Sequence, residues 1–252
     1  MGQYRMLVDV TKCIGCYSCR VACQMENDLP PDQSYISFCE VEKGEYPNVE
    51  WVMHRFSCLH CEDAVCEKVC PQNAISYSQT GAVVVDQEQC IGCEYCEKNC
   101  PFGRAKVELC QDKEGNSVSR ANKCTLCNGK VLEGMTPACA STCYTEAIVF
   151  GESDEILQKA EQRLAEVKDR YPDANIYNPE GVGGTHTIYL LAHKPEEYDL
   201  ESDATTPASA IIWKDYAQPL GKLLLGATTM AVIGGAISNR LFNKGEHHEG
   251  GE

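Results

Sequence analysis

The sequence is short of positive charge. Of its 252 residues, 22 are lysine or arginine and 37 are aspartate or glutamate, which gives a formal net charge of -15. Proteins that bind DNA or RNA through the phosphates need basic surfaces, and this chain lacks such a surplus. Nucleic acid is therefore excluded as an expected partner, and the acidic surplus is typical of an ordinary soluble surface.

Two other features are missing. The N-terminal segment MGQYRMLVDV has no apolar run long enough for a secretory signal peptide and no twin arginine. If the protein is exported, we expect something else to carry it. The sequence also lacks the patterns of a nucleotide-binding loop, a nucleophilic triad or a pterin site, so we predict a protein without catalysis of its own.

Cysteine is present in excess. Sixteen of the 18 cysteines fall into four groups of four, each ending in C-x3-C. The groups are Cys13, Cys16, Cys19 and Cys23; Cys58, Cys61, Cys66 and Cys70; Cys90, Cys93, Cys96 and Cys100; and Cys124, Cys127, Cys139 and Cys143. Disulfide scaffolds are short secreted chains, and cysteines this close in sequence pair only with strain. Zinc sites favour separated C-x2-C pairs. We therefore predict four [4Fe-4S] clusters held by soft thiolates.

The third group, CIGCEYCEKNCP, has the spacing of bacterial ferredoxins. Its first three thiols can surround one cluster from a tight loop. The fourth, Cys100, lies on the next turn, and in ferredoxins this cysteine ligates the other cluster of a pair.

The segments that flank the groups repeat. Asp9 and Asp86 each precede the first cysteine of a group by four residues. The dipeptide Ala-Ile begins four residues after the last cysteine of both the second and the fourth groups. Alternating apolar residues around Thr80-Gly81 predict a hairpin that joins groups two and three into an inner unit. Groups one and four then form an outer unit, cut at its hairpin, whose strands near 5–10 and 146–150 should pair.

Exchange of each fourth cysteine within a unit assigns all sixteen ligands. Cluster 1 takes Cys13, Cys16, Cys19 and Cys143; cluster 2 takes Cys23, Cys124, Cys127 and Cys139; cluster 3 takes Cys58, Cys61, Cys66 and Cys100; and cluster 4 takes Cys70, Cys90, Cys93 and Cys96. The exchange links the two halves of each unit through metal, so loss of the clusters is expected to unfold most of this region.

A few residues near the groups need separate interpretation. Cys39 and Cys110 are left over and are expected to pack as small apolar side chains. His60, in CLHC, is expected to form hydrogen bonds in its loop, because four thiols already fill the site. Arg104 and Lys106 could place positive charge near a cluster and raise its reduction potential, or could be ordinary surface cations.

The chain changes character after the last group. Residues 153–198 predict a helix in SDEILQKAEQRLAEVKDRYP, with Ser153 as its N-cap, followed by a strand in GGTHTIYLLAH that ends near His193. The apolar stripe of the helix is Ile156, Leu157, Ala160, Leu164 and Val167. Residues 199–212 are acidic and weakly patterned, which indicates a linker.

Residues 213–240 predict a single transmembrane anchor. From Leu220 to Ile237 the residues are mostly apolar, and eighteen helical residues rise about 27 Å, close to the hydrocarbon thickness of about 30 Å. We expect residues 217–238 to contact the lipid bilayer; a buried soluble helix is the alternative. Basic residues lie on both sides and do not fix the orientation. Residues 241–252 form a polar tail whose His247-His248 pair is a weak metal candidate.

The sequence thus predicts an α+β protein with two ferredoxin-like [4Fe-4S] units in residues 1–152. The inner unit, 55–110, is inserted into the outer unit, 1–30 and 120–152. A C-terminal transmembrane helix completes the chain.

This arrangement resembles the iron–sulfur subunit of molybdopterin oxidoreductases of the dimethyl-sulfoxide-reductase family. The segments GGTHTIYLLAHKPEEY and IIWKDYAQPLGKLLLGA, with one span, are similar to the beta subunit of membrane-bound formate dehydrogenases. The resemblance implies the sixteen ligands named above, a catalytic subunit with a molybdenum or tungsten pterin that oxidises formate, and a cytochrome b-type membrane subunit that reduces quinone. The sequence lacks the proline after Cys23 and Cys143 and is somewhat short for the family, but keeps every ligand.

The resemblance also implies a location. Such complexes are often exported already folded on the signal of the catalytic subunit, so the cluster units are expected on the outer, periplasmic face of the membrane, with the cytoplasmic face still open. The same relay could instead serve a polysulfide, tetrathionate, nitrate or dimethyl sulfoxide reductase, or a membrane hydrogenase. A zinc-rich assembly module is the alternative of another class, and it would hold zinc in place of iron.

Overall fold

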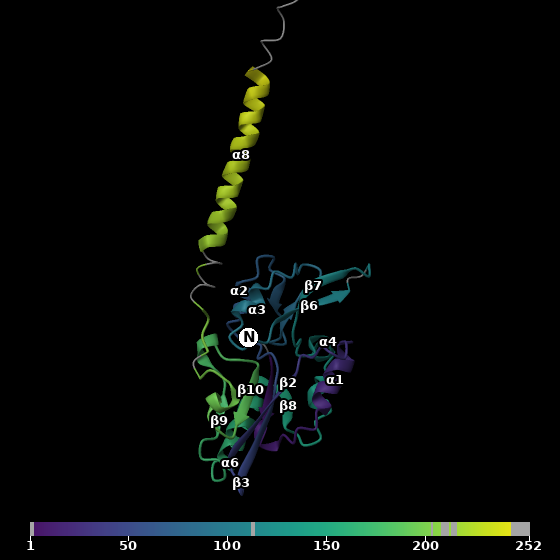
Figure 1. Cartoon of the computed structure of the whole chain (residues 1–252), viewed down its shortest axis with the longest axis vertical. Coiled ribbons are helices and arrows are strands. Elements are labelled where there is room, and N and C mark those ends of the chain that lie inside the picture. Colours follow the sequence, from purple (N-terminus) through teal and green to yellow (C-terminus); the bar gives the residue numbers. More distant parts are fainter. Residues whose placement is uncertain (1–2, 112–113, 203, 208–211, 213–215, 243–252) are drawn as a thin grey trace, which may run out of the picture. The chain divides into compact units, whose positions relative to one another are not determined.

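A computed structural model describes residues 3–111, 114–202, 204–207, 212 and 216–242. The protein divides into two compact units, Met1–Pro207 and Ala208–Glu252 (Figure 1). The first unit contains all the cysteines. The second contains one long helix.

The centre of the first unit is a four-stranded sheet in the order β8-β1-β10-β9. Its strands are β1 (Tyr4–Asp9), β8 (Ile148–Glu152), β9 (Asn175–Tyr177) and β10 (Thr187–Leu191). The antiparallel pairing of β1 with β8 confirms the pairing expected between the two ends of the outer unit. The parallel pairing of β1 with β10 was not predicted. It places the strand expected before His193 in the same sheet.

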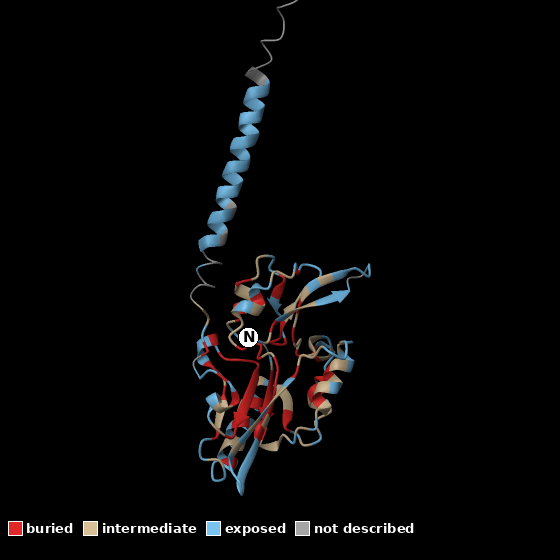
Figure 2. Ribbon diagram, in the orientation of Figure 1, coloured by how far each residue is buried: buried red, intermediate tan, exposed pale blue. Residues whose placement is uncertain are grey.

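The two faces of this sheet have different partners because side chains alternate along each strand. Leu7 and Ile188 point to one face, where the apolar stripe of α6 (Ser153–Val167) covers them. Met6 and Tyr189 point to the other face and join the core that contains the cysteine loops. Figure 2 shows this sheet as the most buried part of the unit. The sheet therefore separates the core beneath α6 from the core that contains Cys19, Cys23 and Cys139.

The helix α6 begins at Ser153 itself, with Glu152 as the preceding residue, and no side chain caps it. The prediction of Ser153 as the N-cap was therefore wrong. Its backbone N–H donates instead to the carbonyl of Gln3, at 2.8 Å. Asp154 and Glu155 still lie in the first turn, where negative charge suits the helix dipole.

The inner unit contains the predicted hairpin, formed by β4 (Ile75–Tyr77) and β5 (Val83–Val85). Two short helices, α2 (Val65–Lys68) and α3 (Tyr95–Asn99), precede and follow it. In Figure 1 the two helices lie at the upper end of the first unit, away from α6.

Two further hairpins were not predicted. The first consists of β2 (Ser37–Glu45) and β3 (Asn48–Phe56), and the second of β6 (Lys106–Gln111) and β7 (Ser117–Asn122). Both contain many charged and exposed residues. Their two-stranded sheets have weak apolar alternation, which is the signal that sequence analysis depends on.

Short helical segments complete the first unit. They are the 3-10 turns η1 (Val10–Lys12), η2 (Glu180–Val182) and η3 (Pro195–Tyr198) and the helices α1 (Ser18–Glu26), α4 (Asn128–Leu132) and α5 (Ala138–Ser141).

The beginning of the segment interpreted as a linker packs on the first unit. Leu200 and Ala204 are buried in its main core. Thr206 donates a hydrogen bond from its hydroxyl to the carboxylate of Asp63, at 3.2 Å. The polypeptide therefore leaves the first unit after Pro207, beside the inner cysteine groups.

The second unit contains α8 (Gln218–Phe242). Among the described residues, one helical stretch, Pro219–Arg240, is long and apolar enough to cross a membrane, with a mean hydropathy of 1.6. The described side chains from Pro219 to Arg240 are exposed, as Figure 2 shows along the helix. His247 and His248, the metal candidates of the sequence analysis, lie outside the described residues.

Candidate cofactor site

The inner unit brings eight cysteines together around two internal spaces. The first space is lined by Cys58, Cys61, Cys66 and Cys100. The second is lined by Cys70, Cys90, Cys93 and Cys96. Each space takes three thiols from one sequence group and the fourth from the other. We refer to these as set 3 and set 4, after the clusters to which the sequence analysis assigned them.

The thiols of the outer unit divide in the same way by electrostatic contact. One set contains Cys13, Cys16, Cys19 and Cys143, whose charges act on one another. The other contains Cys23, Cys124, Cys127 and Cys139. We call them set 1 and set 2. The structure thus brings all sixteen predicted ligands into four sets, each drawn from two distant segments of the sequence.

Helix geometry explains why the fourth thiol of a group leaves its neighbours. Cys19 and Cys23 both lie on α1, four residues apart. Four helical residues advance about 6 Å along the axis, so Cys23 reaches the next set. Cys96 on α3 and Cys100 at its C-terminal end repeat this arrangement.

The internal repeat extends to the hydrogen bonds that close the loops. The backbone N–H of Asp9 donates to the carbonyl of Ala147 at 2.7 Å, and that of Asp86 donates to the carbonyl of Ala74 at 2.7 Å. The carboxylate of each aspartate accepts the backbone N–H two residues further on, at 2.9 and 2.8 Å. The two units therefore hold their first cysteines with the same turn.

The tight loops also need glycine at equivalent positions. Gly15 has φ +65° and Gly92 has φ +66°, in the region that favours glycine. A Cβ atom at Gly92 would press on the backbone of Ser119, and one at Gly15 would press on the side chain of Met53. These loops can therefore close around their sets only with glycine there.

Backbone N–H groups donate to several of the sulfur atoms. The pairs are Ala74 with Cys70, Arg104 with Cys100 and Ala121 with Cys90, each at 3.3 Å, and Leu126 with Cys124 at 3.4 Å. Donors of this kind stabilise a thiolate relative to a thiol. In iron–sulfur proteins they also raise the reduction potential.

Burial opposes ionisation of several of the sixteen thiols when no metal is bound. It raises the pKa of Cys66, Cys96 and Cys139 to about 12. Cys16 is the exception, because it is exposed and hydrogen bonds with Ser18 lower its pKa. Cys66, Cys96 and Cys139 would therefore be protonated at neutral pH, so a bound metal must displace their protons.

Two cations are buried among the sets. The guanidinium of Arg55, 1% exposed, donates to the hydroxyl of Ser57 at 2.6 Å and interacts electrostatically with thiols of sets 1 and 2. The ammonium of Lys123, 4% exposed, lies 3.7 Å from the sulfur of Cys58 and donates to the carbonyls of Val83 and Cys124. Buried charges are costly without a partner of opposite sign, so both require anions nearby.

These features fit thiolate-bound iron–sulfur clusters. Two fully buried donors, Nε2 of His60 and Nε of Arg55, have no hydrogen-bond partner in the described structure. Within the described ranges, no three side chains of His, Cys, Asp or Glu converge on a single metal ion. A tetrahedral zinc site needs its four ligands gathered around one ion, and the described thiols are not gathered in that way. An anionic cluster of several atoms would fill the space of a set and supply acceptors for the buried donors. The ligand assignment itself stays a prediction.

Thiols of neighbouring sets lie close enough to raise one another's pKa. Three electrostatic contacts between thiols cross from one set to the next: Cys19 with Cys139, Cys124 with Cys58, and Cys96 with Cys66. Set 1 therefore neighbours set 2, set 2 neighbours set 3, and set 3 neighbours set 4. The contact between sets 2 and 3 joins the outer unit to the inner unit, with Lys123 beside it.

The leftover cysteines do not both pack as predicted. Cys39 is half-buried on β2, where it pairs with His54 of β3. Cys110 is exposed on β6, so its prediction as a packed apolar side chain was wrong.

The other singled-out residues can now be placed. His60 accepts a hydrogen bond from the backbone N–H of Val83 at 3.0 Å, which confirms its hydrogen-bonding role. Arg104 lines the space of set 3, and its guanidinium lies 4.2 Å from the ring centre of Phe56. Lys106 is an exposed cation, 3.2 Å from the carboxylate of Glu97.

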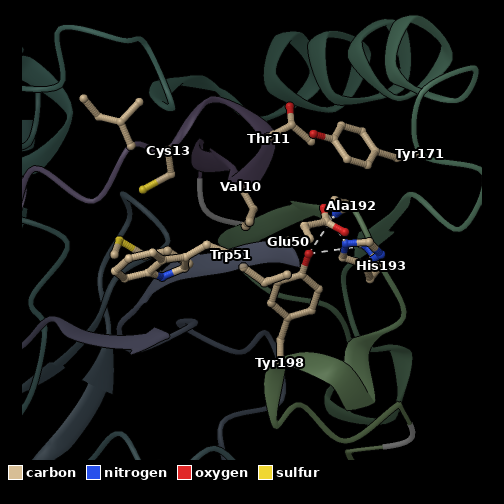
Figure 3. A pocket seen from close by; sticks show the side chains of 12 residues that line it. Val10, Thr11, Cys13, Glu50, Trp51, Tyr171, Ala192, His193 and Tyr198 are labelled. Carbon is tan, nitrogen blue, oxygen red and sulfur yellow. Dashed lines mark hydrogen bonds and ion pairs between the residues drawn. The ribbon is translucent and has the colours of Figure 1, made fainter. Parts of the chain in front are cut away.

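A surface cavity of about 370 Å³ lies beside set 1 (Figure 3). Cys13, Trp51 and Tyr198 line it, and the imidazole of His193 lies 3.1 Å from the carboxylate of Glu50. Trp51 is 68% exposed. Sequence analysis missed this cavity, since a third of its lining residues come from the unpredicted hairpin β2–β3. Set 1 is thus close to the protein surface.

Comparison with known proteins also indicates an iron–sulfur protein. The profile of the 4Fe-4S dicluster domain matches residues 49–153. The nitrate-inducible formate dehydrogenase iron–sulfur subunit of Escherichia coli is 41% identical over 255 residues, which cover 92% of this protein and 84% of that subunit. The formate dehydrogenase iron–sulfur subunit of Haemophilus influenzae is 37% identical over 90% of this protein and 78% of its own length. The B component of the anaerobic dimethyl sulfoxide reductase of Escherichia coli is 35% identical over 62% of this protein and 77% of its own length.

Proposed function

Because this chain belongs to the family of formate dehydrogenase iron–sulfur subunits, we propose that it relays single electrons through four [4Fe-4S] clusters and catalyses no reaction itself. Electrons from formate would enter from a catalytic subunit with a molybdenum or tungsten pterin. They would leave to a cytochrome b-type membrane subunit and then to quinone.

One observation carries this proposal. Sixteen cysteines gather in four sets of four, and each set combines segments from two parts of the sequence. Four thiolates are the ligand set of a [4Fe-4S] cluster. The clusters would supply reversible one-electron chemistry, while the protein holds them in series and keeps them from water.

The path of the electrons follows from the order of the sets. Clusters 1, 2, 3 and 4 would form one series, with set 1 and set 4 at its ends. The segment that leads to the C-terminal helix leaves beside Asp63, between ligands of set 3. We therefore assign the inner unit to the membrane partner, and set 1, with the cavity at Trp51 and Cys13, to the catalytic subunit.

We also propose that residues 217–238 anchor the protein in the bilayer, with the cluster units on the outer face. The length and hydropathy of the stretch Pro219–Arg240 support a span. The orientation rests on the family resemblance, and limited proteolysis of intact spheroplasts would test it. Digestion of the cluster units only after lysis would contradict the outer location.

A second candidate function is the same relay for another pterin enzyme. The similarity to the B component of a dimethyl sulfoxide reductase supports it. That similarity covers 62% of this protein, whereas the formate dehydrogenase relatives match at least 90%. The formate relay is therefore the better-supported proposal.

Anaerobic purification of the native complex from membranes tests the proposal. We expect about sixteen irons per polypeptide, a co-purifying large subunit that contains molybdenum or tungsten, and reduction of the cluster signals by formate in electron paramagnetic resonance (EPR). An iron-free or zinc-containing protein would contradict the relay. Clusters that dimethyl sulfoxide oxidises but formate does not reduce would favour the second candidate.

A further inference from the structure

His60 has a buried position that hydrogen bonding within its loop explains only in part. It lies between Cys58 and Cys61, and it is 0% exposed. Its backbone φ is +52°, and it is one of the residues that line the space of set 3 together with the four thiols. A group that fills this space would therefore lie against His60.

The hydrogen bond to Nδ1 of His60 fixes where the proton of the imidazole lies. The backbone N–H of Val83 donates to Nδ1 at 3.0 Å, so Nδ1 is an acceptor. A neutral imidazole then carries its proton on Nε2. Because Nδ1 accepts this hydrogen bond it carries no proton, and the ring is neutral. Nε2 has no partner among the described atoms.

We infer that the Nε2–H of His60 donates a hydrogen bond to a sulfur atom of cluster 3 and raises the reduction potential of that cluster. This inference rests on the proposed function, since it requires the cluster. A buried donor without an acceptor is costly, and a cluster sulfur in this space removes that cost. The reduced cluster carries more negative charge than the oxidised cluster and accepts the hydrogen bond more strongly. The bond therefore favours reduction.

The internal repeat provides a matched comparison. Leu126 occupies the equivalent position in the outer unit, two residues after Cys124 as His60 is two residues after Cys58. It is 1% exposed and has φ +54°. The same loop therefore accepts leucine in set 2, where it offers no side-chain donor. The substitution His60→Leu therefore places in the loop of set 3 the residue that the loop of set 2 already contains.

The test is a redox titration of the purified complex, followed by EPR. In His60→Leu we expect the equilibrium constant for reduction of one cluster to fall about tenfold, which is about 59 mV for one electron. His60→Gln keeps a donor near the same place and should show less than half of that shift. Leu126→Met, which changes the equivalent residue without adding a donor, should leave all four potentials unchanged.

Two results from the variants would overturn the inference. One is a His60→Leu complex that keeps four clusters with unchanged potentials. The other is an equal shift in the Leu and Gln variants, because this would indicate a packing effect. If His60→Leu fails to assemble cluster 3, the inference can be tested on the wild-type complex labelled with ¹⁵N-histidine. Pulsed EPR should detect coupling of one ring nitrogen to one reduced cluster, and its absence would overturn the inference. An iron-free wild-type protein would overturn the proposed function instead.

Discussion

Among single residues, the two cations buried near the cysteine sets, Arg55 and Lys123, are expected to affect function most. Lys123 immediately precedes Cys124 of set 2, yet its ammonium lies 3.7 Å from Cys58 of set 3. Sequence analysis singled out Arg104 and Lys106 and passed over Lys123 and Arg55. A lysine next to a cysteine in the sequence gives no signal of its role. The sulfur that it approaches, that of Cys58, belongs to a distant segment, so the pairing becomes visible only in the structure.

We expect Lys123→Met to make cluster 3 harder to reduce. The side chains are similar in length, so the change removes mainly the charge. A unit charge about 8 Å from the added electron contributes about 2 kcal/mol at an effective dielectric constant of about 20. At 1.4 kcal/mol for each tenfold change, this lowers the potential by roughly 90 mV. Redox titration of the purified complex with EPR detection measures the shift.

Lys106→Met is the matched control for this prediction. Lys106 is exposed and paired with Glu97, where solvent screens its charge. Its removal should leave the potentials within about 20 mV of the wild type. Equal shifts in the two variants would show that Lys123 does not act through its buried position.

At the scale of the elements, α1 and α3 would enforce the predicted crossed ligation, because one helical turn separates the third and fourth cysteines of a group. We expect the double variant Cys58→Ala/Cys100→Ala to lose one cluster, since both thiols belong to set 3. The double variant Cys96→Ala/Cys100→Ala also removes two thiols, but one belongs to set 4 and the other to set 3, so it should alter two clusters. Iron analysis and EPR of the purified complexes distinguish the two outcomes. The reverse pattern would show that each sequence group holds its own cluster.

The elements also show which parts of the fold the sequence could predict. The pairing of β1 with β8 and the turns at Asp9 and Asp86 were predictable, because the repeat preserves short spacings that local geometry requires. The parallel pairing of β1 with β10 joins residues about 180 positions apart and leaves no local pattern. The hairpins β2–β3 and β6–β7 have exposed, charged strands, so the apolar alternation that reveals a strand is weak there.

At the scale of the whole molecule, the boundary after Pro207 predicts that the cluster-binding unit and the anchor can be separated. A protein that ends at Pro207 should be released from membranes by an alkaline carbonate wash, whereas the full-length protein should remain, because it keeps the apolar helix. The shorter protein should retain its clusters and its resistance to denaturant.

A protein that ends at Asp199 also loses Leu200 and Ala204, both buried in the main core. Removal of these side chains should lower the free energy of unfolding by roughly 2–3 kcal/mol. Loss of visible absorption during a guanidinium titration measures this difference. If the two truncated proteins unfold together, residues 200–207 do not contribute to the core, and if the protein ending at Pro207 stays in carbonate-washed membranes, the C-terminal helix is not the anchor.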